Sequence, residues 1–245
     1  QMTKKPATVE KFIDDLIAQI HDKGHAEYEQ LVALKRQATK NETAVFNAWD
    51  FNFYENIQKQ QLDVDEVEVK QYFPADHVVA ETLQIYQELL GLKFAPAECS
   101  TWHEDVTCYT VADAESQELM GQFYLDLYPR EGKFDHAACF PLATRHNGDA
   151  GLQRPIAAMV TNFDPPPKGK KATMAHEEVV TFFHEFGHVM HNMCQEVNYA
   201  LLGGFGVESD FVELPSQMLE NWVWDKQVLQ RLSKHVDTGK PMPDE

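Results

Sequence analysis

The most constraining feature of the sequence is His184-Glu185-Phe186-Gly187-His188, which lies inside a stretch of helical periodicity. The apolar positions of this stretch recur every three or four residues, at Val179, Phe182, Phe183, Phe186, Met190 and Met193. Four residues advance about 400° around a helix, so both imidazoles lie on one face, about one turn apart. The pattern therefore predicts a helix over residues 173–199, capped at Thr173, that can present two imidazoles to a single metal ion.

Glu185 lies between these histidines and projects about 100° from His184 around the helix, beside a shared ion rather than on it. A carboxylate in that place can take a proton from a zinc-bound water, so Glu185 is the candidate general base. A zinc ion with an open catalytic position needs three protein ligands. The candidates for the third are His191, Cys194, Glu208, Asp210, Glu213 and Glu220.

The positions of these candidates in the sequence decide which of them can be the third ligand. The Cα of His191 lies about 10.5 Å along the helix axis from that of His184, too far for a straight helix to bring all three imidazoles onto one ion. A turning glycine followed by a third histidine is also excluded, because His191 and Cys194 occupy those two positions. We therefore expect a carboxylate from a second helix, predicted over residues 210–232, with Glu213 in its first turn. Gln217 and Glu220 share its face and are candidates for hydrogen bonds to the ligands.

The rest of the chain predicts a mainly α protein with a small antiparallel β-sheet, of the α+β class. Residues 1–100 show mostly helical periodicity, and 101–245 form the predicted catalytic region. Short segments rich in β-branched and aromatic residues within 104–162 predict three or four strands, at 106–111, 122–128, 136–140 and 156–162. Residues 59–70 predict a solvated helix or connector. Residues 164–171 contain three prolines and predict a linker loop.

Composition limits the class of partner. A net charge of −18 disfavours nucleic-acid binding, which requires cations to neutralise phosphates. No apolar stretch approaches the roughly 18 residues of a membrane span, and the amino terminus leads into an amphipathic segment rather than a secretory one. The four cysteines form no Cys-x-x-Cys pair, so reduced thiols are expected. These features predict a cytoplasmic protein, with a mitochondrial location second, that binds neither nucleic acid nor membrane.

Several separated motifs are shared with a known family. They are residues 184–191 (HEFGHVMH), 210–213 (DFVE), 215–224 (PSQMLENWVW), 102–106 (WHEDV) and 121–132 (GQFYLDLYPREG). Together they resemble the thimet oligopeptidase and neurolysin family of zinc oligopeptidases. The resemblance implies a zincin-like catalytic portion and one Zn²⁺ per chain, held by His184, His188 and Glu213. It also implies Glu185 as the base and short peptides as substrates.

The resemblance carries further expectations. The segment containing His136, Ala137 and Ala138 resembles the family's edge strand, against which the substrate backbone lies. Family members usually carry a Ser-Gly-Thr turn where this chain has Gly203-Gly204-Phe205. They are also several hundred residues longer, and their tyrosine-rich carboxy-terminal segment, which helps to bind substrate and stabilise the tetrahedral intermediate, lies beyond the position of Glu245. We therefore expect this chain alone to be a weak peptidase, and surface left uncovered could allow self-association.

Three functions are compatible with these features. The first is a zinc endopeptidase acting on short peptides. The second is a truncated, catalytically weak zinc-containing fragment that binds peptides. The third, a structural zinc protein, is disfavoured because structural sites are closed by four protein ligands, usually rich in cysteine. Zinc content measured together with peptide cleavage separates the three.

Overall fold

The chain forms two compact units, Gln1–Glu66 and Val67–Glu245, in a computed structural model that describes residues 3, 5–61, 65–166 and 168–243. This division lies well before the predicted boundary after residue 100. Helix α4 (Ala75–Leu90) packs against strand β1 (Leu92–Pro96) and against helix α7 (Lys226–Leu232), all in the second unit. The helical segment just before residue 100 thus belongs with the sheet and not with the helices that precede it.

The first unit is helical, as predicted. It contains α1 (Pro6–Thr39), a 3-10 turn η1 (Ala48–Asp50) and α2 (Phe51–Gln61), which packs against α1. Leu31, Val32 and Tyr54 are buried, and Lys35 pairs with Asp50 at 2.5 Å. The predicted helix or connector over 59–70 falls on the end of α2 and on α3 (Glu66–Lys70), and its residues 62–64 lie outside the described residues.

The second unit is built on a five-stranded sheet with strand order β1-β2-β3-β7-β4. The strands after β1 are β2 (Thr107–Asp113), β3 (Leu119–Asp126), β4 (Ala138–Ala143) and β7 (Ile156–Val160), and β5 (His146–Gly148) pairs with β6 (Gly151–Gln153) in a separate ribbon. The α+β class is confirmed. The sheet is mixed rather than purely antiparallel, because β7 inserts between β3 and β4 and runs parallel to β3.

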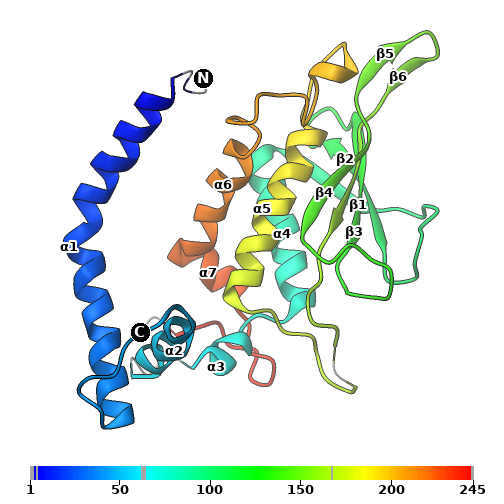
Figure 1. Cartoon of the computed structure of the whole chain (residues 1–245). Helices are drawn as coiled ribbons and strands as arrows, with labels where there is room; N and C mark the ends of the chain where they lie inside the picture. Colours follow the sequence, from blue (N-terminus) through cyan, green and yellow to red (C-terminus); the bar gives the residue numbers. More distant parts are fainter. Residues whose placement is uncertain (1–2, 4, 62–64, 167, 244–245) are drawn as a thin grey trace. The chain divides into compact units, whose positions relative to one another are not determined.

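Helix α5 (His176–Met193) lies against this sheet and carries the predicted motif (Figure 1). Its apolar face is fully buried, with Phe182, Phe183 and Phe186 at 0% exposure. Burying each such side chain contributes about 1.5–3 kcal/mol. The ring of Phe186 packs edge-on against Phe123 of β3, and the hydroxyl of Tyr86 on α4 donates a hydrogen bond to the Phe183 carbonyl at 2.8 Å. The sheet and α4 therefore fix the orientation of α5.

The ends of the two predicted metal-binding helices differ from expectation. Helix α5 is capped at Ala175 rather than at Thr173, because the Glu178 carboxylate accepts the Ala175 N–H at 2.6 Å. The second helix is divided into α6 (Leu214–Glu220), the 3-10 turn η3 (Asn221–Trp224) and α7. Asp225 has an extended backbone at the break, and its carboxylate caps α7.

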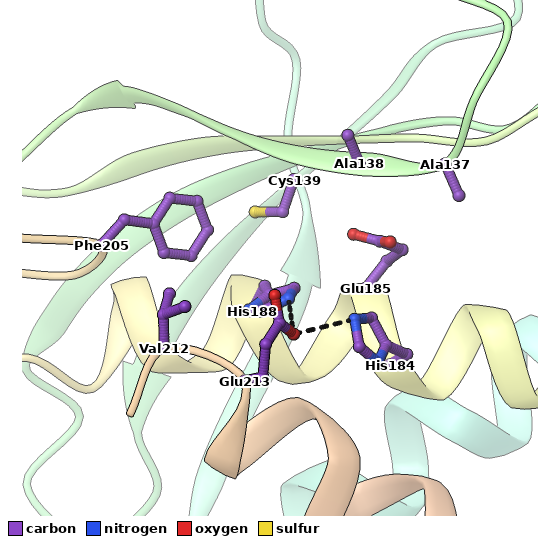
Figure 2. A pocket seen from close by; sticks show the side chains of 9 residues that line it. All are labelled: Ala137, Ala138, Cys139, His184, Glu185, His188, Phe205, Val212 and Glu213. Carbon is purple, nitrogen blue, oxygen red and sulfur yellow. Dashed lines mark ion pairs between the residues drawn. The ribbon is translucent and has the colours of Figure 1, made fainter. Parts of the chain in front are cut away.

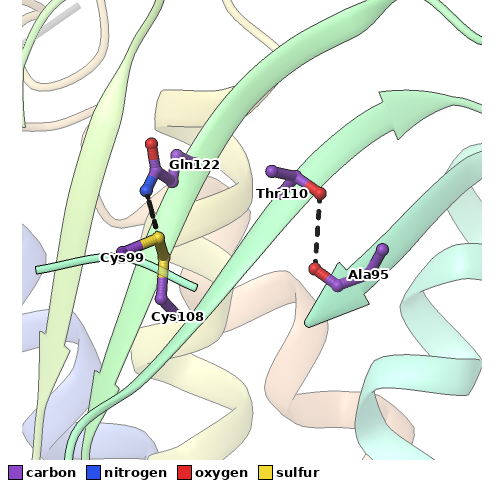
Figure 3. The surroundings of a disulfide bond; sticks show 5 residues. All are labelled: Ala95, Cys99, Cys108, Thr110 and Gln122. Atoms are coloured by element: carbon purple, nitrogen blue, oxygen red, sulfur yellow. Dashed lines mark hydrogen bonds between the residues drawn. A yellow bond between two sulfur atoms is a disulfide. The ribbon is translucent and has the colours of Figure 1, made fainter. Parts of the chain in front are cut away.

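The expectation of reduced thiols is wrong for one pair, since Cys99 and Cys108 form a disulfide (Figure 3). Their Cα atoms lie 6.2 Å apart, within the range a disulfide spans. The Gln122 side chain on β3 donates to both sulfur atoms, at 2.7 Å and 3.0 Å. Pairing in the sheet brings the two cysteines together, and their spacing in the sequence did not indicate it. Cys139 and Cys194 are free.

Two other expectations concern the proline-rich segment at residues 164–171 and membrane-spanning helices. Residues 164–166 and 168–171 contain neither helix nor strand, as predicted for a proline-rich loop, and Pro167 lies outside the described residues. No helix in the described part of the chain combines the length and apolar character needed to cross a membrane.

Candidate metal centre

The site begins with a close approach of two helices. A Cβ added to Gly187 on α5 would lie 2.8 Å from the Ser216 Cα on α6, so the two backbones come closer than any larger residue allows. Glu213 is the residue that caps α6, one turn before Ser216, and not a residue inside its first turn. The Ser216 hydroxyl donates to both the carbonyl and the carboxylate of Glu213 at 2.9 Å. Gly187 and Ser216 therefore hold the Glu213 carboxylate against α5.

Three ligand atoms meet where the helices approach (Figure 2). The Glu213 Oε2 lies 3.2 Å from the His184 Nε2 and 3.1 Å from the His188 Nε2. All three atoms lie within 4.8 Å of one another. The His188 side chain is 8% exposed and the Glu213 side chain 46%. The cluster thus has a buried side on the helix and an open side toward the pocket.

These distances can be compared with those of a bound ion. Zinc binds imidazole nitrogen and carboxylate oxygen at about 2.0–2.2 Å, so neighbouring ligand atoms of a tetrahedral site lie about 3.3 Å apart. The two contacts of Glu213, 3.2 and 3.1 Å, are close to this spacing. Two imidazoles and one carboxylate with an open fourth position are also the donor set of a catalytic zinc. The three residues therefore fit a zinc ion.

Hydrogen bonds orient one of the imidazoles. Glu220 accepts a hydrogen bond from the His184 Nδ1 at 2.5 Å, which leaves the Nε2 lone pair for a metal. The His188 Nδ1 is buried and has no hydrogen-bond partner among the described residues. Burial lowers the pKa of His188 and favours the neutral, metal-binding imidazole. The Gln217 side chain is exposed and makes no hydrogen bond to a ligand within the described residues.

Glu185 projects into the same pocket as the three ligand atoms (Figure 2). The residue is 8% exposed. Burial raises the pKa of the Glu185 carboxyl, and the neighbouring Glu213 raises it further, whereas His184 and the Cys139 backbone N–H act in the opposite direction. A carboxylate with a raised pKa is a better proton acceptor near neutral pH. His191, by contrast, lies outside the cluster, with its ring beside Phe211.

The pocket over the cluster has a volume of about 380 Å³. Its lining residues are Ala137, Ala138, Cys139, His184, Glu185, His188, Phe205, Val212 and Glu213. Ala138 and Cys139 belong to β4, which is an edge of the sheet. The side chain of His136 is 79% exposed and does not line this pocket.

Three lining residues were not among the predicted site residues, namely Cys139, Phe205 and Val212. Val212 directly precedes Glu213, and Cys139 follows the predicted alanines, so proximity in the sequence could have indicated both. Phe205 follows two glycines in a loop, and no periodicity reports where such a side chain points.

Residues 1–245 match the family model described as Peptidase family M3. The chain is 40% identical over 255 residues to the thimet-like oligopeptidase of Dictyostelium discoideum, covering 99% of this chain and 38% of that protein. It is 36% identical to oligopeptidase A of Escherichia coli (strain K12) and to saccharolysin of Saccharomyces cerevisiae, covering 100% of this chain and 36% of each protein. The chain thus spans little more than a third of the length of these relatives.

Proposed function

Because the chain belongs to peptidase family M3, we propose that it carries the catalytic centre of a zinc-dependent endopeptidase that hydrolyses short peptides. One Zn²⁺ would be held by His184, His188 and Glu213, with Glu185 as the general base. The observation that carries the proposal is the convergence of three ligand atoms beside a buried carboxylate in one pocket. Relatives named oligopeptidases support short peptides as the substrate class.

When bound, zinc supplies a Lewis acid that polarises the scissile carbonyl and lowers the pKa of a water molecule. Glu185 accepts a proton from the attacking water as the new C–O bond forms. It then donates that proton to the nitrogen of the leaving amine as the C–N bond breaks. The burial that raises the pKa of Glu185 serves both steps, because the group must accept and later release one proton.

The edge strand supplies a place for the substrate backbone. β4 ends the sheet, and Ala137 and Ala138 line the pocket where this strand begins. An extended peptide can add to such an edge by main-chain hydrogen bonds, and the small alanine side chains leave room for it. We include His136 in this binding segment only through its neighbours, since its own side chain points into solvent.

The proposal is tested by separating metal binding from hydrolysis. Glu185→Gln should keep stoichiometric zinc and the fold while peptide hydrolysis falls by about 10² to 10⁴-fold, the range for loss of a general base. Glu213→Gln should weaken zinc binding strongly, and His191→Gln, just outside the cluster, is the matched control that should not. Elemental analysis, circular dichroism and cleavage of a quenched fluorescent peptide are the measurements.

Two results would contradict this assignment. Normal hydrolysis by Glu185→Gln would show that another group is the base. Stronger zinc loss in His191→Gln than in Glu213→Gln would show that the ligand set is wrong. A chain that holds zinc and binds peptides without cleaving them would be a peptide-binding fragment instead of a peptidase.

A further inference from the structure

The pocket has two chemically different ends on either side of the metal ligands. Figure 2 shows Phe205 and Val212 at one end, with Ala137 and Glu185 at the other. The ring of Phe205 stands edge-on to the imidazole of His188, with ring centroids 5.3 Å apart. A peptide carbonyl at the ligand cluster would therefore place one flanking side chain against Phe205.

The loop that carries Phe205 is held in place by buried side chains. Added Cβ atoms at Gly203 and Gly204 would overlap the side chains of Gln195 and Asn192, and Gly204 has a φ of +54°. Asn192 is 1% exposed, and its amide donates to the His188 carbonyl at 2.9 Å. The loop is thus packed onto the helical turn that presents the metal ligand. Phe205 therefore belongs to a loop whose preceding two glycines leave no room for a side chain.

The charges around the pocket are all of one kind. Glu185 and Glu213 are the carboxylates that line it, and no lysine or arginine lines it among the described residues. At the Phe205 end, the wall offers an aromatic ring and the branched side chain of Val212. An acidic substrate side chain there would lose water and find no cationic side chain among the described lining residues, whereas an apolar one would lose little.

We infer that Phe205, together with Val212, selects an apolar side chain on one side of the scissile bond. This inference rests on the proposed function and adds a substrate preference to it. Phe205 is a specificity-determining residue, since it contacts the substrate side chain and neither holds the metal nor moves a proton. Differences of one methylene in apolar pockets change selectivity by about 10–200-fold, so an apolar residue should be preferred over aspartate by at least about 10-fold.

Binding can test the inference without turnover. We would measure dissociation constants of peptide hydroxamates for the zinc-loaded chain, with pairs that differ only by leucine or aspartate beside the hydroxamate. Two series, with the hydroxamate at the carboxyl or at the amino end, place the varied side chain on either side of the metal. In one series the unmodified chain should prefer leucine by at least about 10-fold.

Variants of Phe205 then test whether its ring causes the preference for leucine. Phe205→Thr should reduce the preference to below about threefold, and Phe205→Leu, which keeps an apolar wall, should retain most of it. Leu201→Ala is the matched control, because that side chain is 89% exposed in the same region. Zinc content and circular dichroism confirm that each variant keeps its site.

The outcomes separate this inference from the proposed function. A leucine preference that survives unchanged in Phe205→Thr, or equal binding of both probes by the unmodified chain, would overturn the inference and leave the metal site standing. Failure of the unmodified, zinc-loaded chain to bind any hydroxamate would overturn the proposed function together with the inference.

Discussion

Gly187→Ala is the substitution that most directly tests how the candidate metal centre is built. The new Cβ would lie 2.8 Å from the Ser216 Cα and 3.4 Å from the Leu219 side chain. Carbon atoms in contact lie about 3.5–4.0 Å apart, so α6 would have to retreat by about 0.7 Å or more. Glu213 caps α6 and is hydrogen-bonded to Ser216, so its carboxylate would move with the helix.

The expected effects on zinc binding and on the stability of the fold are of similar size. Metal sites tolerate deviations of about 0.2 Å in ligand distance, well below the required shift. We expect the zinc dissociation constant to rise at least about 10-fold, comparable to disturbing groups that orient metal ligands. For the metal-free chain, alanine gains about 1 kcal/mol over glycine in a helix, while overpacking costs about 1–3 kcal/mol. The free energy of unfolding should therefore fall by no more than about 2 kcal/mol.

The assay is competition for zinc with a chromophoric chelator, combined with urea unfolding of the metal-free chain. Gly24→Ala is the matched control, because Gly24 lies inside α1 and a Cβ there meets nothing within 4 Å. It should leave the zinc dissociation constant unchanged. If Gly187→Ala binds zinc as tightly as the unmodified chain, the close approach at Gly187 does not position Glu213 and the reasoning fails.

Three further predictions concern hydrogen bonds around the site and in the core. Glu220→Ala should weaken zinc binding about 10–100-fold by removing the acceptor for the His184 Nδ1, measured by the same competition assay. Lys133→Met should destabilise the chain by about 3 kcal/mol in urea, because it removes a 3% exposed ammonium from the buried Asp126. Burial raises the pKa of Asp126, but hydrogen bonds from Arg130, Trp102 and Lys133 outweigh it and leave the pKa below its ordinary value of 3.8. Its contribution to stability is thus present above that pH and lost as pH falls below it, so acid unfolding should begin at a higher pH in Lys133→Met. Identical acid midpoints would contradict the role of this pair.

The helices could be predicted because their information is local. The apolar residues of α5 recur with the helical period, and the same period fixes how far apart His184 and His188 lie. Glu213 could be proposed from the sequence because a helix of about 1.5 Å rise per residue cannot offer a third imidazole at His191. Glu220 followed from sharing a face with Glu213, and it contacts His184 although it lies about two turns further along α6.

The features that were missed depend on contacts distant in the sequence. Strand patterns identified β3 and β7, but not that β7 inserts beside β3 in a parallel pair. The Cys99–Cys108 disulfide depends on another pairing, because the antiparallel pair of β1 and β2 brings the chain after Pro96 back beside Cys108. The break at Asp225 was missed although its signal is local, since aspartate is a preferred N-cap residue and its carboxylate accepts the N–H groups of Gln227 and Val228.

Gly187 is a position where local helix propensity and tertiary packing favour different residues. Glycine inside a helix costs about 1 kcal/mol relative to alanine, so local propensity alone argues against it in the middle of α5. The packing of α6 explains the glycine, because the Ser216 backbone occupies the space that a side chain at position 187 would fill. A residue that weakens its own helix thereby brings in the carboxylate that completes the ligand cluster. Local preference and tertiary geometry disagree at this position, and the disagreement marks where the candidate site is assembled.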